Sequence, residues 1–286
     1  MKSLLVTTLV AFAFAAASRR RELFVLRWAP NRDTWAALAA GFLPAGLSGL
    51  ALVLTRGSLA FNVLLWVFIF GLCGFAIPWG YVLFVERRGP AALGLTSQGW
   101  ARSLAISALF AAGSIYALVQ RVDVTKLEPS HVLGAIVHLN VGGLFELFLY
   151  CGFLHLRLRD AFGALPAIVG AAAIYSLWHI GTELPMHPDP AAALLMLLVV
   201  GLLCHALFAT TYNLLVIWPL FFTAGVMHDF IANLGLPDSI GRSLGWPLVG
   251  WILAIGVPSG LWLAAGRPGG RGVVSPPLSP DHTRAR

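Results

Sequence analysis

The sequence predicts an all-α fold, a polytopic integral membrane helix bundle of about eight or nine transmembrane helices. Hydrophobic residues make up 58% of the 286 residues and charged residues only 11%, and the mean hydropathy is +0.82. Such a chain is too apolar to build a water-soluble surface. Apolar runs of about 20 residues, the length that crosses the hydrocarbon of a bilayer, recur between short charged or Pro/Gly-rich breaks. Because these runs are apolar on all sides, they indicate helices.

The first apolar run covers residues 3–18 and is succeeded at once by Arg19, Arg20 and Arg21. A basic run opposes the export of the chain segment after it, so we interpret the first run as a short spanning helix or an uncleaved anchor. A cleaved signal peptide is the alternative. The later runs predict spans at residues 35–55, 58–85, 103–120, 132–156, 164–181, 190–210, 213–235 and 245–265.

The chain divides at these spans into parts of different character. We expect an N-terminal anchor helix and basic loop (1–34), transmembrane helices (35–129), a core of helices that carries the polar residues (130–235), a last transmembrane helix (236–266) and a disordered basic tail rich in Gly, Pro, Ser and Arg (267–286).

The net charge of +7 does not point to a nucleic-acid partner, because the arginines cluster at the edges of the apolar runs. Arginines in that position report membrane topology, and the set of alternate loops that includes Arg19 to Arg21 holds most of them and should face the cytoplasm. The cysteines all fall inside apolar runs, which predicts packing residues and no disulfide framework. They are Cys73, Cys151 and Cys204.

Few ionisable side chains lie inside the predicted spans, and each is a candidate functional residue because it costs about 2.5 to 3.5 kcal/mol in hydrocarbon. They are Glu146, His179, His228, Asp229, His138, His155 and His205. Two imidazoles can hold Zn²⁺ while a carboxylate takes a proton from its water, so helices that each carry one such group suit a buried hydrolytic site. The alternatives are a helix-to-helix hydrogen bond for the histidines and a protonated, hydrogen-bonded carboxyl for Glu146.

The sequence around these residues resembles the CPBP family of intramembrane metalloproteases, which includes the type II CAAX prenyl proteases, over residues 130–235. The first motif of that family is Glu-Glu-x-x-x-Arg-Gly. Aligned on Gly152, Glu146 takes the place of the first glutamate, Leu147 replaces the second, and Cys151 replaces the arginine. The resemblance implies that the arginine of the motif holds the glutamates in place.

The second and third motifs of the family are Phe-x-x-x-His and His-x-x-x-Asn. Tyr175 and His179 match the second motif, and His228 matches the histidine of the third, after a glycine-containing helix and a tight polar turn at Thr-Thr-Tyr-Asn. The fourth residue after His228 is Ala232, and the asparagine comes next, at Asn233. A spacing of five residues turns a helix by about 140° beyond a full turn, so Asn233 reaches the site only if the helix ends or bulges there. Asp229 or His205 could substitute for it.

The resemblance implies an endopeptidase in which Glu146 is the base that activates water, while His179 and His228 bind a metal or polarise the substrate carbonyl. Asn233 is a further candidate metal ligand. The implied cofactor is a divalent metal ion, Zn²⁺, and the implied substrate is a membrane-embedded or membrane-proximal peptide or protein. The implied location is the bacterial cytoplasmic (inner) membrane, as a multi-pass protein. Prenylated substrates are not carried across to this chain.

Two other functions remain open. A degenerate family member could bind peptides or membrane proteins without cutting them, and Leu147, Cys151 and Ala232 support this alternative. A transporter or proton relay could use Glu146, Asp229 and the histidines. The sequence shows no repeated halves, which many transporters have.

Overall fold

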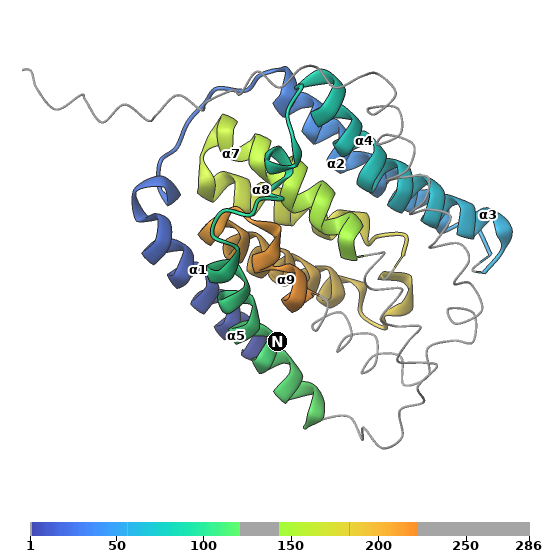
Figure 1. Cartoon of the computed structure of the whole chain (residues 1–286). Helices are drawn as coiled ribbons and strands as arrows, with labels where there is room; N and C mark the ends of the chain where they lie inside the picture. The colour runs from blue at the N-terminus through green and yellow to red at the C-terminus, as the bar shows by residue number, and fades with distance from the viewer. Residues whose placement is uncertain (1, 56, 121–142, 183, 222–286) are drawn as a thin grey trace, which may run out of the picture.

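The computed structural model describes residues 2–55, 57–120, 143–182 and 184–221. Within these ranges the regular elements are all helices, which confirms the predicted all-α class. The predicted last transmembrane helix (236–266) and the basic tail (267–286) lie outside the described residues. Figure 1 shows α1 and α5 along one side of the bundle, α2 to α4 along the other, and α7 to α9 between them.

The helices match the apolar runs of the sequence closely. Their bounds are α1 Lys2–Leu23, α2 Arg32–Ala51, α3 Leu59–Asn62, α4 Ile77–Gly80, α5 Trp100–Val119, α7 Leu156–Phe162, α8 Ala164–Trp178 and α9 Pro190–Thr211. Wide π-helical turns at Val63–Ala76, Tyr81–Val85 and Leu147–His155 join some of these helices end to end, and short 3₁₀ turns lie at Pro90–Leu93, Leu184–Met186 and Leu214–Val216.

Three helices in the described part of the chain are long and apolar enough to cross a membrane. They are Arg32–Ala51, Leu59–Val85 and Pro190–Thr211. Together with the composition of the chain, they identify an integral membrane protein.

The ends of the helices show why the chain turns where it does. Asn31 begins α2 with a capping box, in which its side chain accepts a hydrogen bond from the Thr34 amide and the Thr34 hydroxyl accepts one from the Asn31 amide. The helix α1 runs on through the basic residues that were expected to lie beyond it, with a break in helical geometry at Arg19. The predicted spans therefore differ from the helices by a few residues at their ends.

The polar turn predicted after the glycine-containing helix is confirmed. The helix α9 ends at Thr211, and Tyr212 takes a left-handed backbone conformation with φ of 52°. The buried Asn213 then fixes the turn, because its side-chain amide donates a hydrogen bond of 2.8 Å to the carbonyl of Thr96 and its side-chain oxygen accepts one of 3.1 Å from the Leu215 amide.

The helical segment 143–162 lies at the centre of the bundle, and nearly all of its side chains are buried. It packs against α2, α8 and the turn at Pro90–Leu93. The turn comes so close that a Cβ atom on Gly152 would lie 2.6 Å from the carbonyl oxygen of Leu93. Glycine is therefore the residue that this contact accommodates. The helices α8 and α9 also approach closely, because Gly201 lies against Ala172 and Tyr175.

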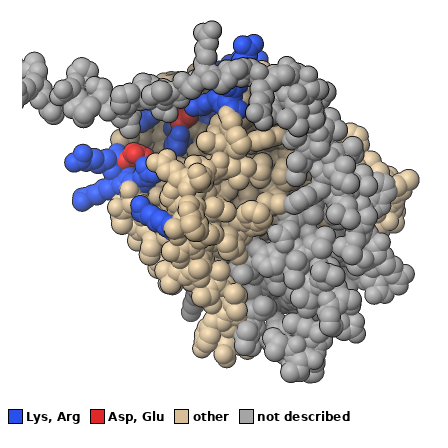
Figure 2. Space-filling model, in the orientation of Figure 1, with Lys and Arg blue, Asp and Glu red and all other residues tan. Residues whose placement is uncertain are grey.

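Charged residues gather at one end of the molecule. Figure 2 shows arginine side chains in blue at this end, with acidic residues among them, while the described surface of this face away from it carries other residue types. Clustered positive charge is typical of the cytoplasmic ends of spanning helices, so the charge distribution agrees with the topology expected from the sequence.

We expect Gly152→Ala to lower the free energy of unfolding by about 1 to 3 kcal/mol, because the added methyl group must displace the backbone at Leu93. Thermal unfolding in detergent micelles measures this change. The matched control is Gly46→Ala on α2, where an added Cβ meets nothing within 4 Å. An equal effect of the two substitutions would show that the close contact at Leu93 does not matter.

Candidate functional site

The site begins with Glu146, whose side chain is buried in the centre of the bundle. It precedes the wide turns of Leu147–His155 and is 8% exposed. The neighbouring Phe145 is fully buried in the largest apolar cluster and packs edge-on against Trp178 at the end of α8, with ring centroids 5.1 Å apart. This packing brings the segment that carries Glu146 to the end of α8.

The facing residue is His179, which directly follows α8 as its C-cap and is 1% exposed. Its Nε2 lies 3.6 Å from Oε1 of Glu146, and its Nδ1 lies 3.0 Å from the carbonyl oxygen of Tyr175. A carbonyl oxygen only accepts hydrogen bonds, so we assign the proton to Nδ1. The rings of Trp178 and Tyr175 pack on the imidazole, with centroid distances of 4.3 Å and 4.8 Å, and limit its rotation.

The fixed tautomer decides what the pair can do. With Nδ1 donating to Tyr175, Nε2 of neutral His179 points a lone pair toward the carboxyl of Glu146 at 3.6 Å, beyond direct hydrogen-bonding distance. Two lone pairs repel unless a proton or a cation lies between or beside them. The pair is therefore suited to share a proton or to face a positive ion.

The other predicted site residues lie elsewhere. His228 and Asn233, together with the alternative Asp229 and with His138, lie outside the described residues. In the ranges that the structure describes, no group of three or more His, Cys, Asp or Glu residues is arranged to hold a metal ion. The structure thus brings together two of the predicted residues, Glu146 and His179.

His155 and His205 contact each other between two helices. Such a contact is the alternative to a role as metal ligands that the sequence left open. Their Nδ1 atoms are 3.1 Å apart, and their rings stack with centroids 5.2 Å apart. Because one Nδ1 must donate and the other accept, the two rings have opposite tautomers. The thiol of Cys151 lies 3.7 Å from Nδ1 of His205. His205 is thus engaged by residues other than Glu146, which argues against its substituting for Asn233.

Two positions of the first motif carry a different residue from the family, and both lie among apolar side chains. Leu147, which stands for the second glutamate, is 2% exposed, and Cys151, which stands for the arginine, is 3% exposed. Both belong to an apolar cluster with Leu207 and Phe208 of α9. All three cysteines of the chain are free and buried, as expected for packing residues.

A buried ion pair on the same helical segment as Glu146 was not predicted from the sequence. Arg157 is one of the arginines at the edges of the apolar runs, which were expected in the loops, but it lies within α7 and its side chain is 7% exposed. Its Nε and Nη2 donate to the Glu86 carboxylate at 3.0 Å and 2.7 Å, and its Nη1 donates to the carbonyl of Ala92 at 2.8 Å. The guanidinium also lies over the Phe153 ring, 4.4 Å from its centroid.

This ion pair joins distant parts of the chain. Glu86 comes directly after the long helix Leu59–Val85, and Arg157 continues the helical segment that carries Glu146. The Nη1 of Arg157 also donates to the carbonyl of Gly152 at 3.2 Å. The sequence shows an arginine at a span end and a glutamate 71 residues away, and nothing in either local pattern pairs them.

We expect Arg157→Met to lower the free energy of unfolding by about 3 to 5 kcal/mol, because it leaves the carboxylate of Glu86 buried without its partner. The double variant Arg157→Met/Glu86→Leu should be clearly more stable than this single variant, since it removes both charges. Chemical denaturation in micelles of the two single variants and the double variant measures the coupling. Additive effects would show that the two side chains do not interact.

One region of this chain matches a known protein family. A family model described as type II CAAX prenyl endopeptidase Rce1-like matches residues 128–227. The matched range contains Glu146 and His179 and ends one residue before His228. No curated protein and no solved structure matches the chain.

Proposed function

Over residues 128–227 this chain belongs to the CPBP/CAAX protease family, and from this premise we propose that it is an intramembrane metal-dependent endopeptidase. We place it in a bacterial cytoplasmic membrane as a multi-pass protein that cuts a peptide bond in or near the bilayer. The observation that carries the proposal is the approach of Glu146 Oε1 to His179 Nε2 at 3.6 Å. These residues come from two separate motifs, and both are buried.

In this proposal Glu146 is the general base. Its carboxylate takes a proton from water as the water oxygen attacks the peptide carbonyl, and it returns the proton to the leaving amine. The aromatic rings around His179 hold its imidazole toward the same space. There a protonated Nε2 could donate to the oxyanion, or a neutral Nε2 could bind the metal that polarises the carbonyl.

The donor set around His179 fits a metal ligand. Ligand histidines commonly donate the proton of their other ring nitrogen to a carbonyl or carboxylate, and His179 does so to Tyr175. We propose that His179, His228 and Asn233 hold the divalent ion, Zn²⁺, which would supply a more acidic water and a polarised carbonyl. Glu146 would then move the proton.

A non-catalytic family member is the second candidate. It is favoured by the burial of Leu147 and Cys151 among apolar side chains, because these positions are charged in the family motif. Such a protein would keep the fold of the site and bind a peptide or a membrane protein without cutting it.

We expect the detergent-purified protein to cleave peptides from a fluorogenic library in the presence of Zn²⁺ and to lose this activity on chelation. Glu146→Gln should lower kcat by about 10² to 10⁴, since a general base contributes about that factor. His179→Asn should lower activity similarly, while the control His187→Asn, in the loop before α9, should retain it. Thermal unfolding establishes that each variant is folded.

Other outcomes of this assay decide against the proposal. Unchanged cleavage by folded Glu146→Gln would remove Glu146 as the base. A folded wild-type protein that binds library peptides without cleaving them would establish the non-catalytic function instead.

Metal content gives a test that does not depend on knowing the substrate. We expect about one Zn²⁺ per chain after equilibrium dialysis, measured by mass spectrometry of the metal, since three protein ligands are usual at a catalytic zinc site. His179→Asn and His228→Asn should each bind less, and His187→Asn should bind as the wild type does. Equal metal content in all four proteins would place the ion elsewhere.

A further inference from the structure

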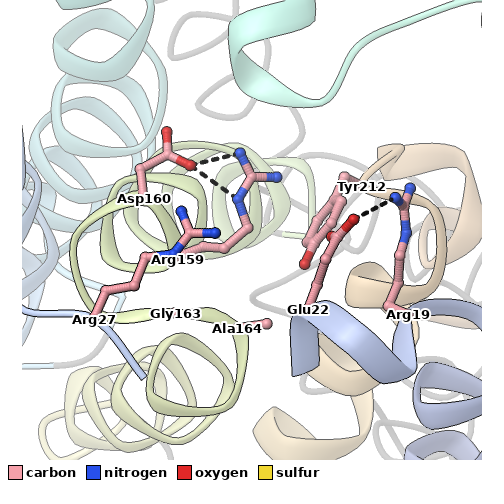
Figure 3. Close-up of a pocket in the computed structure, with 8 residues that line it drawn as sticks. All are labelled: Arg19, Glu22, Arg27, Arg159, Asp160, Gly163, Ala164 and Tyr212. Atoms are coloured by element: carbon pink, nitrogen blue, oxygen red, sulfur yellow. Dashed lines mark hydrogen bonds and ion pairs between the residues drawn. The ribbon is translucent and has the colours of Figure 1, made fainter. Parts of the chain in front are cut away.

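A second polar site lies at the charged end of the molecule, away from Glu146. It is a cavity of about 300 Å³ between the end of α1, the segment after α1, the end of α7, the start of α8 and the end of α9 (Figure 3). Three arginines line it, namely Arg19, Arg27 and Arg159. The family match and the proposed peptidase mechanism give this cavity no role.

Main-chain contacts hold the wall of the cavity in place. The amide of Arg27 donates to the carbonyl of Phe162 at 3.1 Å, and the amide of Ala29 donates to the carbonyl of Ala161 at 2.9 Å. Gly163 has a φ of 98°, and a Cβ atom there would collide with the carbonyl oxygen of Val25. The segment after α1 is therefore fixed against the turn between α7 and α8, and Arg27 is fixed with it.

The arginines retain most of their hydrogen-bonding capacity. Arg19 donates from Nη1 to Glu22 at 3.3 Å, and Arg159 donates from Nε and Nη2 to one oxygen of Asp160 at 2.9 Å and 2.6 Å. The side chain of Arg27 makes no hydrogen bond or ion pair with the described part of the chain. Since each guanidinium has five N–H donors, many of them are available to an anion.

Two further features of the cavity favour an anion. The helix α8 starts at Ala164 in the cavity wall, and no side chain in the described part of the chain caps it, so the positive end of its dipole faces the cavity with uncapped amides. The guanidiniums of Arg19 and Arg159 lie over the Tyr212 ring at 5.2 Å and 4.4 Å, which fixes their positions. Burial raises the pKa of Tyr212, so its phenol stays neutral.

The net charge of the lining residues indicates how much negative charge a bound anion should carry. Three guanidiniums face two carboxylates, those of Glu22 and Asp160, which leaves one positive charge. A phosphodiester carries one negative charge and presents oxygen acceptors in the geometry that arginine binds well.

The surroundings of the cavity indicate where such a phosphate comes from. Leu26 and Trp28, on either side of Arg27, are 73% and 81% exposed. Exposed apolar and tryptophan side chains beside arginines are typical of the headgroup level of a bilayer, and basic pockets between helices on the cytoplasmic side bind lipid headgroups. We propose that this cavity binds the phosphate of an anionic phospholipid such as phosphatidylglycerol. The same chemistry would accept a free phosphate, which the test separates.

The experiment measures thermal unfolding of the full chain in detergent with added dioctanoyl phosphatidylglycerol, dioctanoyl phosphatidylcholine or inorganic phosphate. Phosphatidylglycerol should raise the Tm, and phosphatidylcholine and inorganic phosphate at the same concentration should not. Arg27→Gln should raise the half-saturating lipid concentration about tenfold, the effect of losing one charge-assisted hydrogen bond. Arg88→Gln, an exposed arginine after the helix Leu59–Val85, is the matched control and should bind as the wild type does.

Each other result has a definite meaning. Because the Arg27 side chain has no partner in the described part of the chain, Arg27→Gln should unfold at the wild-type temperature without lipid. Equal stabilisation of Arg27→Gln and wild type by phosphatidylglycerol, or equal stabilisation by phosphatidylcholine, would overturn the proposal. A rise in Tm with inorganic phosphate that Arg27→Gln abolishes would overturn the lipid as the source and identify a free phosphate.

Discussion

The helical segment 143–162 is buried along almost its whole length, so each polar side chain on it must be satisfied by another part of the protein. Glu146 faces His179, His155 stacks on His205, and Arg157 pairs with Glu86. Each partner comes from a different element of the bundle. In a membrane no water replaces a missing partner, so these contacts fix the position of the segment as well as its charge.

The three polar contacts differ in how directly their side chains are hydrogen-bonded. This difference distinguishes a structural contact from a candidate functional one. Arg157 and Glu86 form a bidentate ion pair with additional bonds to main-chain carbonyls, which is the arrangement of a structural contact. Glu146 and His179 lie 3.6 Å apart, with the imidazole fixed through its other nitrogen. At this separation the two groups can share a proton or bind one positive ion that lies beside both of them.

The sequence predicts those features that depend on the local pattern. The apolar runs locate the helices, and an ionisable residue in such a run, as at Glu146 or His179, is costly enough to indicate a site. The contacts between distant residues could not be predicted, because Arg157 has the same local pattern as an arginine that reports topology. The same holds for the cavity at Arg27, which depends on main-chain bonds to a turn far along the chain.

The helix that carries the incomplete first motif has an anchor other than the motif's arginine. An arginine that holds the glutamate helix in place is absent at Cys151, but Arg157 ties the same helical segment to Glu86 and to the carbonyl of Ala92. The loss of the motif's arginine therefore does not leave the helix without an anchor. The remaining difference is Leu147, whose side chain packs into apolar surroundings. Glu146 is thus the one glutamate of the motif that this chain retains. Its position opposite His179 is compatible with a general base.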